Sequence, residues 1–135
     1  MTPDEARRRF AAARVARLAT VSAAGQPHLV PVTFAVEGDT VYTAVDAKPK
    51  RSTSLRRLAN VAANPRVALL ADEYDDDWSR LWWVRADGVA SVAAPDEPRA
   101  AHAAALLSAR YDRFDLRGPV MIVTVTRWSG WSASG

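Results

Sequence analysis

The sequence contains no cysteine and only two histidines, and these absences exclude several kinds of site. Without cysteine there is no disulfide, thiolate metal ligand or cysteine nucleophile in the 135 residues. His28 and His102 lie far apart in the sequence and have no ligand-spaced partner, whereas a zinc site needs several converging ligands. We therefore expect no metal site, and we interpret both histidines as ordinary surface or helix residues.

Long apolar runs and the common nucleotide motifs are also absent. No stretch approaches the about 20 apolar residues that cross a bilayer, and the charged start MTPDEARRRF lacks the apolar centre of a signal peptide. The sequence has no Walker loop, no dinucleotide glycine fingerprint and no nucleophile elbow. We expect a soluble protein of the reducing cytoplasm, with no membrane partner.

Acidic residues are scarce in the first half of the chain. Residues 1–71 carry eleven Lys/Arg against five Asp/Glu, and residues 72–135 carry seven against ten, within a net charge of +3. A nucleic-acid binder usually repeats its basic residues along one surface. The asymmetry therefore favours a small anionic ligand and speaks against nucleic acid.

What is present is an ordinary globular composition, 49% hydrophobic and 24% charged, with no internal repeat or low-complexity linker. We expect a single domain over residues 1–135. Its start predicts a helix, because Thr2 can cap it, Pro3 suits the first helical position and Glu5 completes a capping box. Ala6, Phe10 and Ala13 then fall on one face.

Three strands with short turns are predicted next, over residues 15–22, 28–36 and 40–45. They form an antiparallel meander. In the second run, alternation places four apolar residues on one face: Val30, Val32, Phe34 and Val36. Pro31 in the same run favours an edge or bulged position, because proline has no N–H to donate.

The second half predicts two more helices and three more strands. A helix capped at Ser52 and Thr53 should turn four apolar residues inward: Leu55, Leu58, Ala59 and Ala62. Strands follow over 66–72 and 79–92, with Gly88 as a bulge, then a helix from Pro98 and a strand over 119–128. This order predicts a mainly β, α+β protein: an antiparallel barrel with flanking helices.

The strongest candidate for a binding site is the segment DAKPKRSTSLRRL. Its cations and hydroxyls stand just before or within the start of a helix, whose free N–H groups favour an anion: Lys48, Lys50, Arg51, Ser52 and Thr53. These features together are typical of a phosphate site. The alternative is a solvated basic helix with a good cap.

Five tryptophans are the second clue. Trp78, Trp82 and Trp83 lie close together, and Trp128 and Trp131 lie near the C-terminus. On a pleated strand Trp82 and Trp83 point to opposite faces. At least one of them therefore leaves the core of its own chain, unless a partner or ligand covers it. Core or dimer packing is the simpler interpretation for Trp83 and Trp128.

These motifs in this order resemble the split β-barrel superfamily of pyridoxamine 5'-phosphate oxidase-like proteins, the FMN-binding split barrel. The chain is most similar to the actinobacterial branch that uses the deazaflavin coenzyme F420. Three segments carry the resemblance: RLATVSAAGQPHLVPVTF, VDAKPKRSTSLRRLANVAANPRVALL and DDDWSRLWWVRADGVASV.

The resemblance implies a homodimer with two cofactor sites at the subunit interface. It assigns the cofactor phosphate to Lys48, Lys50, Arg51, Ser52 and Thr53. It places Trp78 near the cofactor bound mainly by the partner subunit. The ring system would lie against the second and third strands, at Pro31, Val32, Thr33, Ala44, Val45 and Asp46.

The number of cations favours F420 over FMN. FMN carries one terminal phosphate, whereas F420 carries a phosphodiester and an oligoglutamate tail. Lys48, Lys50, Arg51, Arg56 and Arg57 offer a longer trail of cations than FMN needs. The compact Ser-Arg-Lys signature of FMN-using relatives is missing, although FMN remains the alternative.

The function that the resemblance implies is hydride transfer between reduced F420 and an unidentified organic acceptor. The sequence offers no convincing acid or base, so no catalytic residue is predicted. Two alternatives stay open. One is an FMN-dependent oxidase or reductase of the same fold, and the other is a carrier that binds F420, flavin or haem without turnover.

Overall fold

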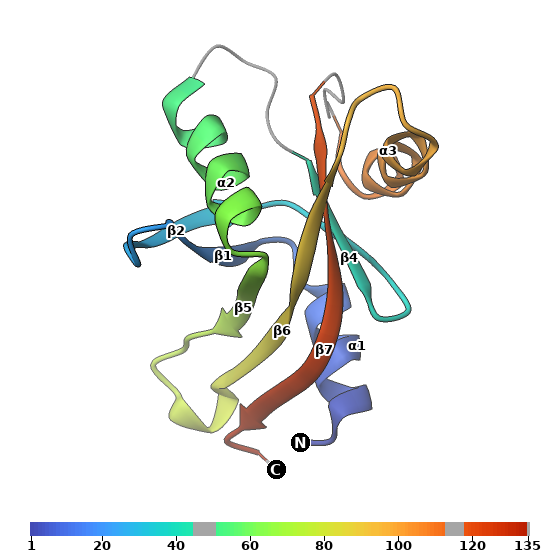
Figure 1. Ribbon diagram of the computed structural model, residues 1–135. Helices are drawn as coiled ribbons and strands as arrows, with labels where there is room; N and C mark the ends of the chain where they lie inside the picture. The colour runs from blue at the N-terminus through green and yellow to red at the C-terminus, as the bar shows by residue number, and fades with distance from the viewer. Residues whose placement is uncertain (45–50, 113–117, 135) are drawn as a thin grey trace.

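The computed structural model describes residues 1–44, 51–112 and 118–134, with the backbone alone for residues 51–55. In the described chain, helices separate groups of one to four strands (Figure 1). In chain order these elements are α1 (Pro3–Ala12), β1 (Ala16–Val21), β2 (Pro27–Val32), β3 (Ala35–Glu37), β4 (Thr40–Ala44), α2 (Arg51–Ala63), β5 (Arg66–Glu73), the 3-10 turn η1 (Trp78–Arg80), β6 (Trp82–Ala93), α3 (Pro98–Arg110) and β7 (Val120–Ser132).

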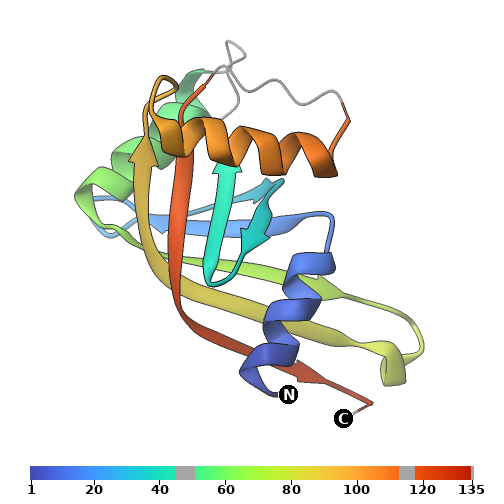
Figure 2. The same cartoon turned by 90° about the vertical axis from the view of Figure 1, so that its right-hand side faces the viewer.

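The strands form one seven-stranded sheet in the order β2-β1-β5-β6-β7-β4-β3, and every neighbouring pair is antiparallel. The long strands β6 and β7 curve through the middle of the molecule (Figure 2). Helix α2 lies on one side of this pair and α3 on the other (Figure 1). The predicted class is confirmed: an α+β, antiparallel split β-barrel with flanking helices.

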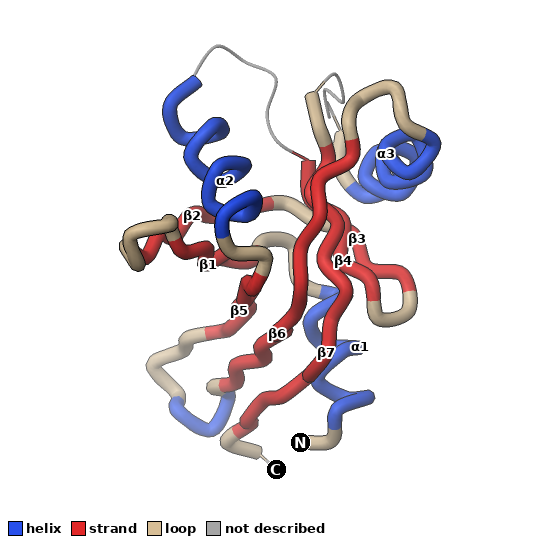
Figure 3. The backbone as a smooth tube through the Cα atoms, viewed as in Figure 1, coloured by secondary structure: helices blue, strands red, loops and turns tan. Residues whose placement is uncertain are grey.

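The single strand predicted over 28–36 is wrong, and so is the three-strand meander. The run divides into β2, which pairs with β1, and β3, which pairs with β4, and the two lie at opposite edges of the sheet (Figure 3). The backbone between them is held by side chains. The Thr43 hydroxyl donates to the Thr33 carbonyl over 2.8 Å, and the Phe34 N–H donates to the Tyr111 hydroxyl over 3.2 Å. Pro31 does lie on an edge strand, as predicted.

The bulge predicted at Gly88 is confirmed. The register between β6 and β7 shifts between Asp87 and Gly88, and a Cβ at Gly88 would collide with the Thr124 carbonyl. Only glycine permits so close an approach of two strands. The bulge bends β6 at the point where the barrel turns.

The main core lies under α1, whose start is capped as predicted: the Thr2 hydroxyl accepts from the Glu5 N–H over 3.2 Å. Phe10 is fully buried, with its ring centroid 4.6 Å from that of Phe34 and 5.5 Å from that of Trp128. The Trp128 indole N–H donates to Asp39 over 2.9 Å. Trp128 is therefore a core residue with a satisfied polar end.

A second, smaller apolar cluster lies between α3 and strands β4, β6 and β7. It includes Ala103 of α3, Ala93 of β6, Val120 of β7 and Tyr42 of β4. Leu107 of α3 is fully buried as well. Within the described ranges no helix is long and apolar enough to span a membrane.

Candidate cofactor site

The predicted phosphate-binding segment leads into α2, which begins at Arg51. Arg51, Ser52 and Thr53 therefore form the first helical turn. Ser52 and Thr53 were predicted to cap the helix, whereas they lie inside it. Four predicted site residues lie outside the described residues: Val45, Asp46, Lys48 and Lys50. The first turn of the helix leaves its N–H groups without carbonyl partners inside the helix, which favours an anion there.

The inward face of α2 is partly polar, contrary to the prediction, because two polar residues are buried beside Val61, which belongs to the main core. Ala59 and Ala62 are exposed and Leu58 is half-buried, whereas Arg57 and Asn60 retain only 9% and 4% of their exposure. Buried polar groups are found where they have partners, and β1 supplies one. The Asn60 side-chain amide donates to the Thr20 hydroxyl over 3.0 Å, and Thr20 is 1% exposed.

His28 of β2 adds to this polar layer, because it pairs in register with Thr20. Burial, then the positive charges of Arg56 and Arg57, lower the pKa of His28 below its ordinary value of 6.5. The buried Nδ1 of His28 has no hydrogen-bond partner within the described ranges. His28 therefore lies close to the two arginines of the second turn of α2.

An anionic group fits this environment. Arg56 is exposed and Arg57 is buried beneath the helix, so one arginine faces solvent and the other faces the barrel. Arg57 was predicted to face away from the barrel, and that prediction is wrong. The exposed trail of cations along α2 is therefore shorter than the sequence implied.

The predicted ring-binding residues do not form one surface. Pro31 is exposed and Val32 is 6% exposed within the core, because neighbouring residues of β2 point to opposite faces. Thr33 follows β2 in the crossing to β3, where its carbonyl accepts from Thr43. Ala44 packs with the cluster under α3. Of the four predicted ring-binding residues that the structure describes, Pro31 is the exposed one.

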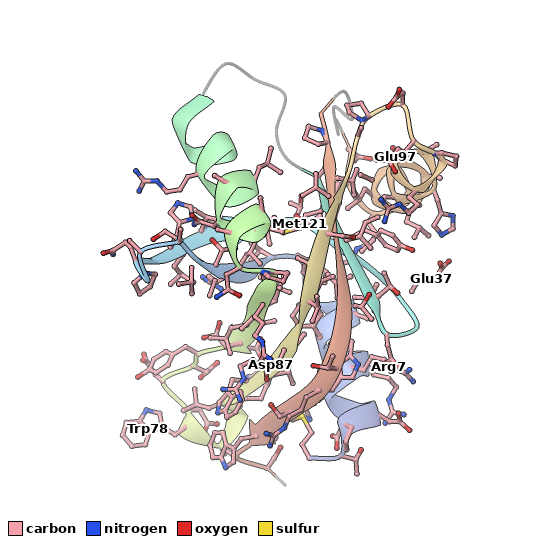
Figure 4. The ribbon with its side chains drawn as sticks, viewed as in Figure 1. Arg7, Glu37, Trp78, Asp87, Glu97 and Met121 are labelled. Carbon is pink, nitrogen blue, oxygen red and sulfur yellow. The ribbon has the colours of Figure 1, made fainter. Side chains whose placement is uncertain are left out.

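Trp78 lies far from α2 within one chain. It is the first residue of η1 and is 69% exposed, and the turn is fixed by Asp77, which accepts from the Ser79 N–H over 3.1 Å. Figure 4 places Trp78 at the opposite end of the molecule from the first turn of α2. A single copy of the chain therefore does not bring Trp78 to the predicted phosphate site.

The outer face of strands β2, β1, β5, β6 and β7 carries large apolar side chains in the open. Leu29, Leu70 and Trp131 are 67%, 37% and 48% exposed. Arg17 of β1 pairs with Pro31 of β2 on one side and with Leu70 of β5 on the other, so the three side chains lie on the same face of the sheet. Trp82 packs against the core, whereas Trp83 is half-buried beside Trp131 on the outer side. The ion pairs Arg17–Asp72 and Arg85–Asp87 lie on the same face, so it is mixed in character. Large apolar side chains left exposed on such a face are typical of an interface.

Sequence reasoning missed the polar layer under α2. The signal was present, because Arg57 and Asn60 are three residues apart and share one helix face. The apolar residues at helical spacing on the other face gave the stronger periodic signal, and the prediction followed that signal. The described ranges contain no group of three or more His, Cys, Asp or Glu side chains that could hold a metal ion.

Comparison with known proteins places this geometry in context. Residues 2–132 match the family model described as pyridoxamine 5'-phosphate oxidase. No curated protein matches the chain.

Several solved structures share the fold. A conserved hypothetical protein of Mycobacterium tuberculosis is 24% identical, with a TM-score of 0.78 over 98% of this chain and 86% of that one. An FAD-binding protein of Mesorhizobium loti is 25% identical, with a TM-score of 0.74 over 96% and 92%. An FAD-binding protein of Mycobacterium smegmatis is 20% identical, with a TM-score of 0.67 over 97% and 95%.

Proposed function

The chain belongs to the pyridoxamine 5'-phosphate oxidase family, and on that premise we propose that it is an oxidoreductase with a phosphate-bearing flavin-type cofactor. Coenzyme F420 is the cofactor that we favour. The acceptor is a small organic molecule. The reaction is hydride transfer between the deazaflavin and that acceptor.

The observation that carries the proposal is the placement of two arginines in the second turn of α2, directly after the predicted phosphate segment. Arg56 is exposed, and Arg57 and Asn60 are buried on the face beneath it. Burying polar residues under α2 stabilises the fold less than burying the apolar Phe10 under α1. The polar residues under α2 are therefore better explained by ligand binding than by stability.

Three parts of this chain would hold the cofactor phosphate: the cations Lys48, Lys50 and Arg51, the hydroxyls Ser52 and Thr53, and the N–H groups of the first turn of α2. Arg56 extends the cations towards a longer anionic tail, which supports F420. When bound, the cofactor supplies the hydride chemistry, and the protein orients it and excludes water.

A flavin is the second candidate. The FAD-binding protein of Mesorhizobium loti matches 96% of this chain at 25% identity. The inward position of Arg57 also removes one cation from the exposed trail that favoured F420. FMN or FAD would use the same start of α2, because each carries phosphate next to a flavin.

A homodimer completes the proposed site. Trp78 and the start of α2 lie at opposite ends of one chain (Figure 4), so a second copy is needed to bring one to the other. The outer sheet face that includes Leu29, Leu70 and Trp131 is the surface on which that copy would pack. We assign no catalytic acid or base.

The test combines binding, turnover and assembly. F420, FMN and FAD are titrated separately, with tryptophan fluorescence as the signal, and we expect F420 to bind most tightly. Reduced F420 is then mixed with quinones and other conjugated acceptors, and its reoxidation is followed. Binding without reoxidation would favour a carrier. Sedimentation at micromolar concentration should show a dimer, and a monomer would contradict the shared site.

A further inference from the structure

A groove of about 370 Å³ lies between α3 and the outer face of β4 and β7, remote from α2. β4 lines it with Thr40 and Tyr42, β7 with Ile122 and Thr124, and α3 with Pro98, Arg99 and His102. The pairing register explains this arrangement, because Tyr42 faces Ile122 and Thr40 faces Thr124 across the two strands. The volume is within the range of small-ligand sites.

The charged groups around the groove neutralise each other in two pairs. At one end Arg99 lies 3.1 Å from Glu97, and at the other the Nε2–H of His102 donates to Glu37 over 2.8 Å. Figure 4 shows Glu97 beside α3 and Glu37 on the β3 side. A charged ligand would have to compete with one of these pairs. The groove therefore favours an uncharged one.

The polar group without a partner in the groove is the phenol of Tyr42. Its side chain is 91% buried, since only 9% of it is exposed, yet its hydroxyl makes no hydrogen bond to any described residue. Burial, and then the negative charge of Glu37, raise the pKa of Tyr42, so the hydroxyl keeps its proton. The hydroxyl itself is reached by solvent through the groove. There it can donate a hydrogen bond to an acceptor on a ligand.

The walls indicate the shape of such a ligand. The rings of Tyr42 and His102 meet edge to face, with their centroids 5.7 Å apart, above the apolar side chain of Ile122. A flat ring packs well against such aromatic surfaces. Arg99 uses two of its guanidinium nitrogens on Glu97 and Ser91, and a guanidinium has five N–H donors. It can therefore donate to a second acceptor.

We propose that this groove is a second ligand site, which binds a small, flat, uncharged carbonyl compound through the Tyr42 hydroxyl. It is separate from the proposed cofactor site, because α2 and α3 lie on opposite sides of the β6–β7 pair (Figure 1). The proposal therefore does not depend on which cofactor the chain binds.

The test uses four probes of nearly equal size and different charge: benzamide, benzoate, benzylamine and toluene. Amide resonances of the full-length protein are followed by NMR during each titration. We expect benzamide to give saturable shifts at Tyr42, Ile122 and Thr124, and to bind at least several-fold more tightly than the other three. Tighter binding of benzoate or benzylamine would overturn the neutral-ligand assignment. No saturable shift in the groove would overturn the site.

Two variants separate recognition from folding. Tyr42→Phe removes only the hydroxyl, and we expect benzamide affinity to fall about five- to tenfold, as the loss of one hydrogen bond predicts. Tyr74→Phe is the matched control, because Tyr74 is 72% exposed and lies outside the groove. Cofactor affinity should be unchanged in both. An unaltered benzamide affinity in Tyr42→Phe would contradict the proposal.

Discussion

Helices α1 and α2 both pack against the sheet, but only α2 buries polar side chains. α1 buries Ala6 and Phe10, and Phe10 contacts the rings of Phe34 and Trp128. α2 buries Val61 in the same core, but it also buries Arg57 and Asn60, the latter over Thr20. Apolar burial is the larger source of stability, and buried polar groups contribute little net. The difference indicates that α1 stabilises the barrel and α2 serves the proposed ligand.

The largest effect should come from the core under α1. Phe10→Ala removes a fully buried ring and should lower the free energy of unfolding by about 3–5 kcal/mol. Urea denaturation measures this loss. Arg8→Ala, at an exposed position of the same helix, is the control and should have little effect. At temperatures where the variant stays folded, its cofactor affinity should match that of the wild type. A large loss of cofactor affinity would contradict the different roles assigned to the two helices.

A smaller effect is expected under α2. Asn60→Leu leaves the buried Thr20 hydroxyl without its hydrogen bond and should lower the free energy of unfolding by about 1–3 kcal/mol. The double variant Asn60→Leu/Thr20→Val removes both partners and should recover much of that loss. If the double variant is no more stable than Asn60→Leu, the pair is not coupled as the geometry implies.

The smallest effect concerns pH and His28. The pKa of His28 is lowered below 6.5 in the folded protein, so the unfolded chain binds more protons as the pH falls below that value. Its contribution to the free energy of unfolding is therefore fully present above about pH 6.5 and is lost at lower pH. His28→Asn should flatten this dependence in urea denaturation between about pH 5 and pH 7. An unchanged slope would contradict the assignment.

Local signals in the sequence predicted the parts of the fold that depend on local chemistry. The cap at Thr2, the bulge at Gly88 and the edge position of Pro31 each follow from one residue's backbone preferences. The division of β2 from β3 was not predictable in this way. It depends on the Tyr111 hydroxyl, which is 77 residues away in sequence and takes the Phe34 N–H.

The candidate site shows the same limit. The presence of a helix after the basic segment could be predicted from the local residues, although it starts at Arg51, before the predicted cap at Ser52 and Thr53. The direction of Arg57 and Asn60 could not, because the apolar stripe of α2 suggested the other face. Their burial is decided by Thr20 on β1, a strand that contacts the helix only after the chain has folded. Tertiary contacts of this kind override local periodicity.

The central claim is that the positive start of α2 holds the cofactor phosphate, and one binding measurement tests it most directly. F420 is titrated into the Lys50→Ala/Arg51→Ala variant and into Arg8→Ala/Arg66→Ala, which removes the same charge at two exposed positions elsewhere. Because charge-assisted hydrogen bonds contribute about 1.5–3 kcal/mol each, we expect the first variant to lose at least about tenfold in affinity. The second should bind like the wild type. Equal affinity in all three proteins would contradict the account.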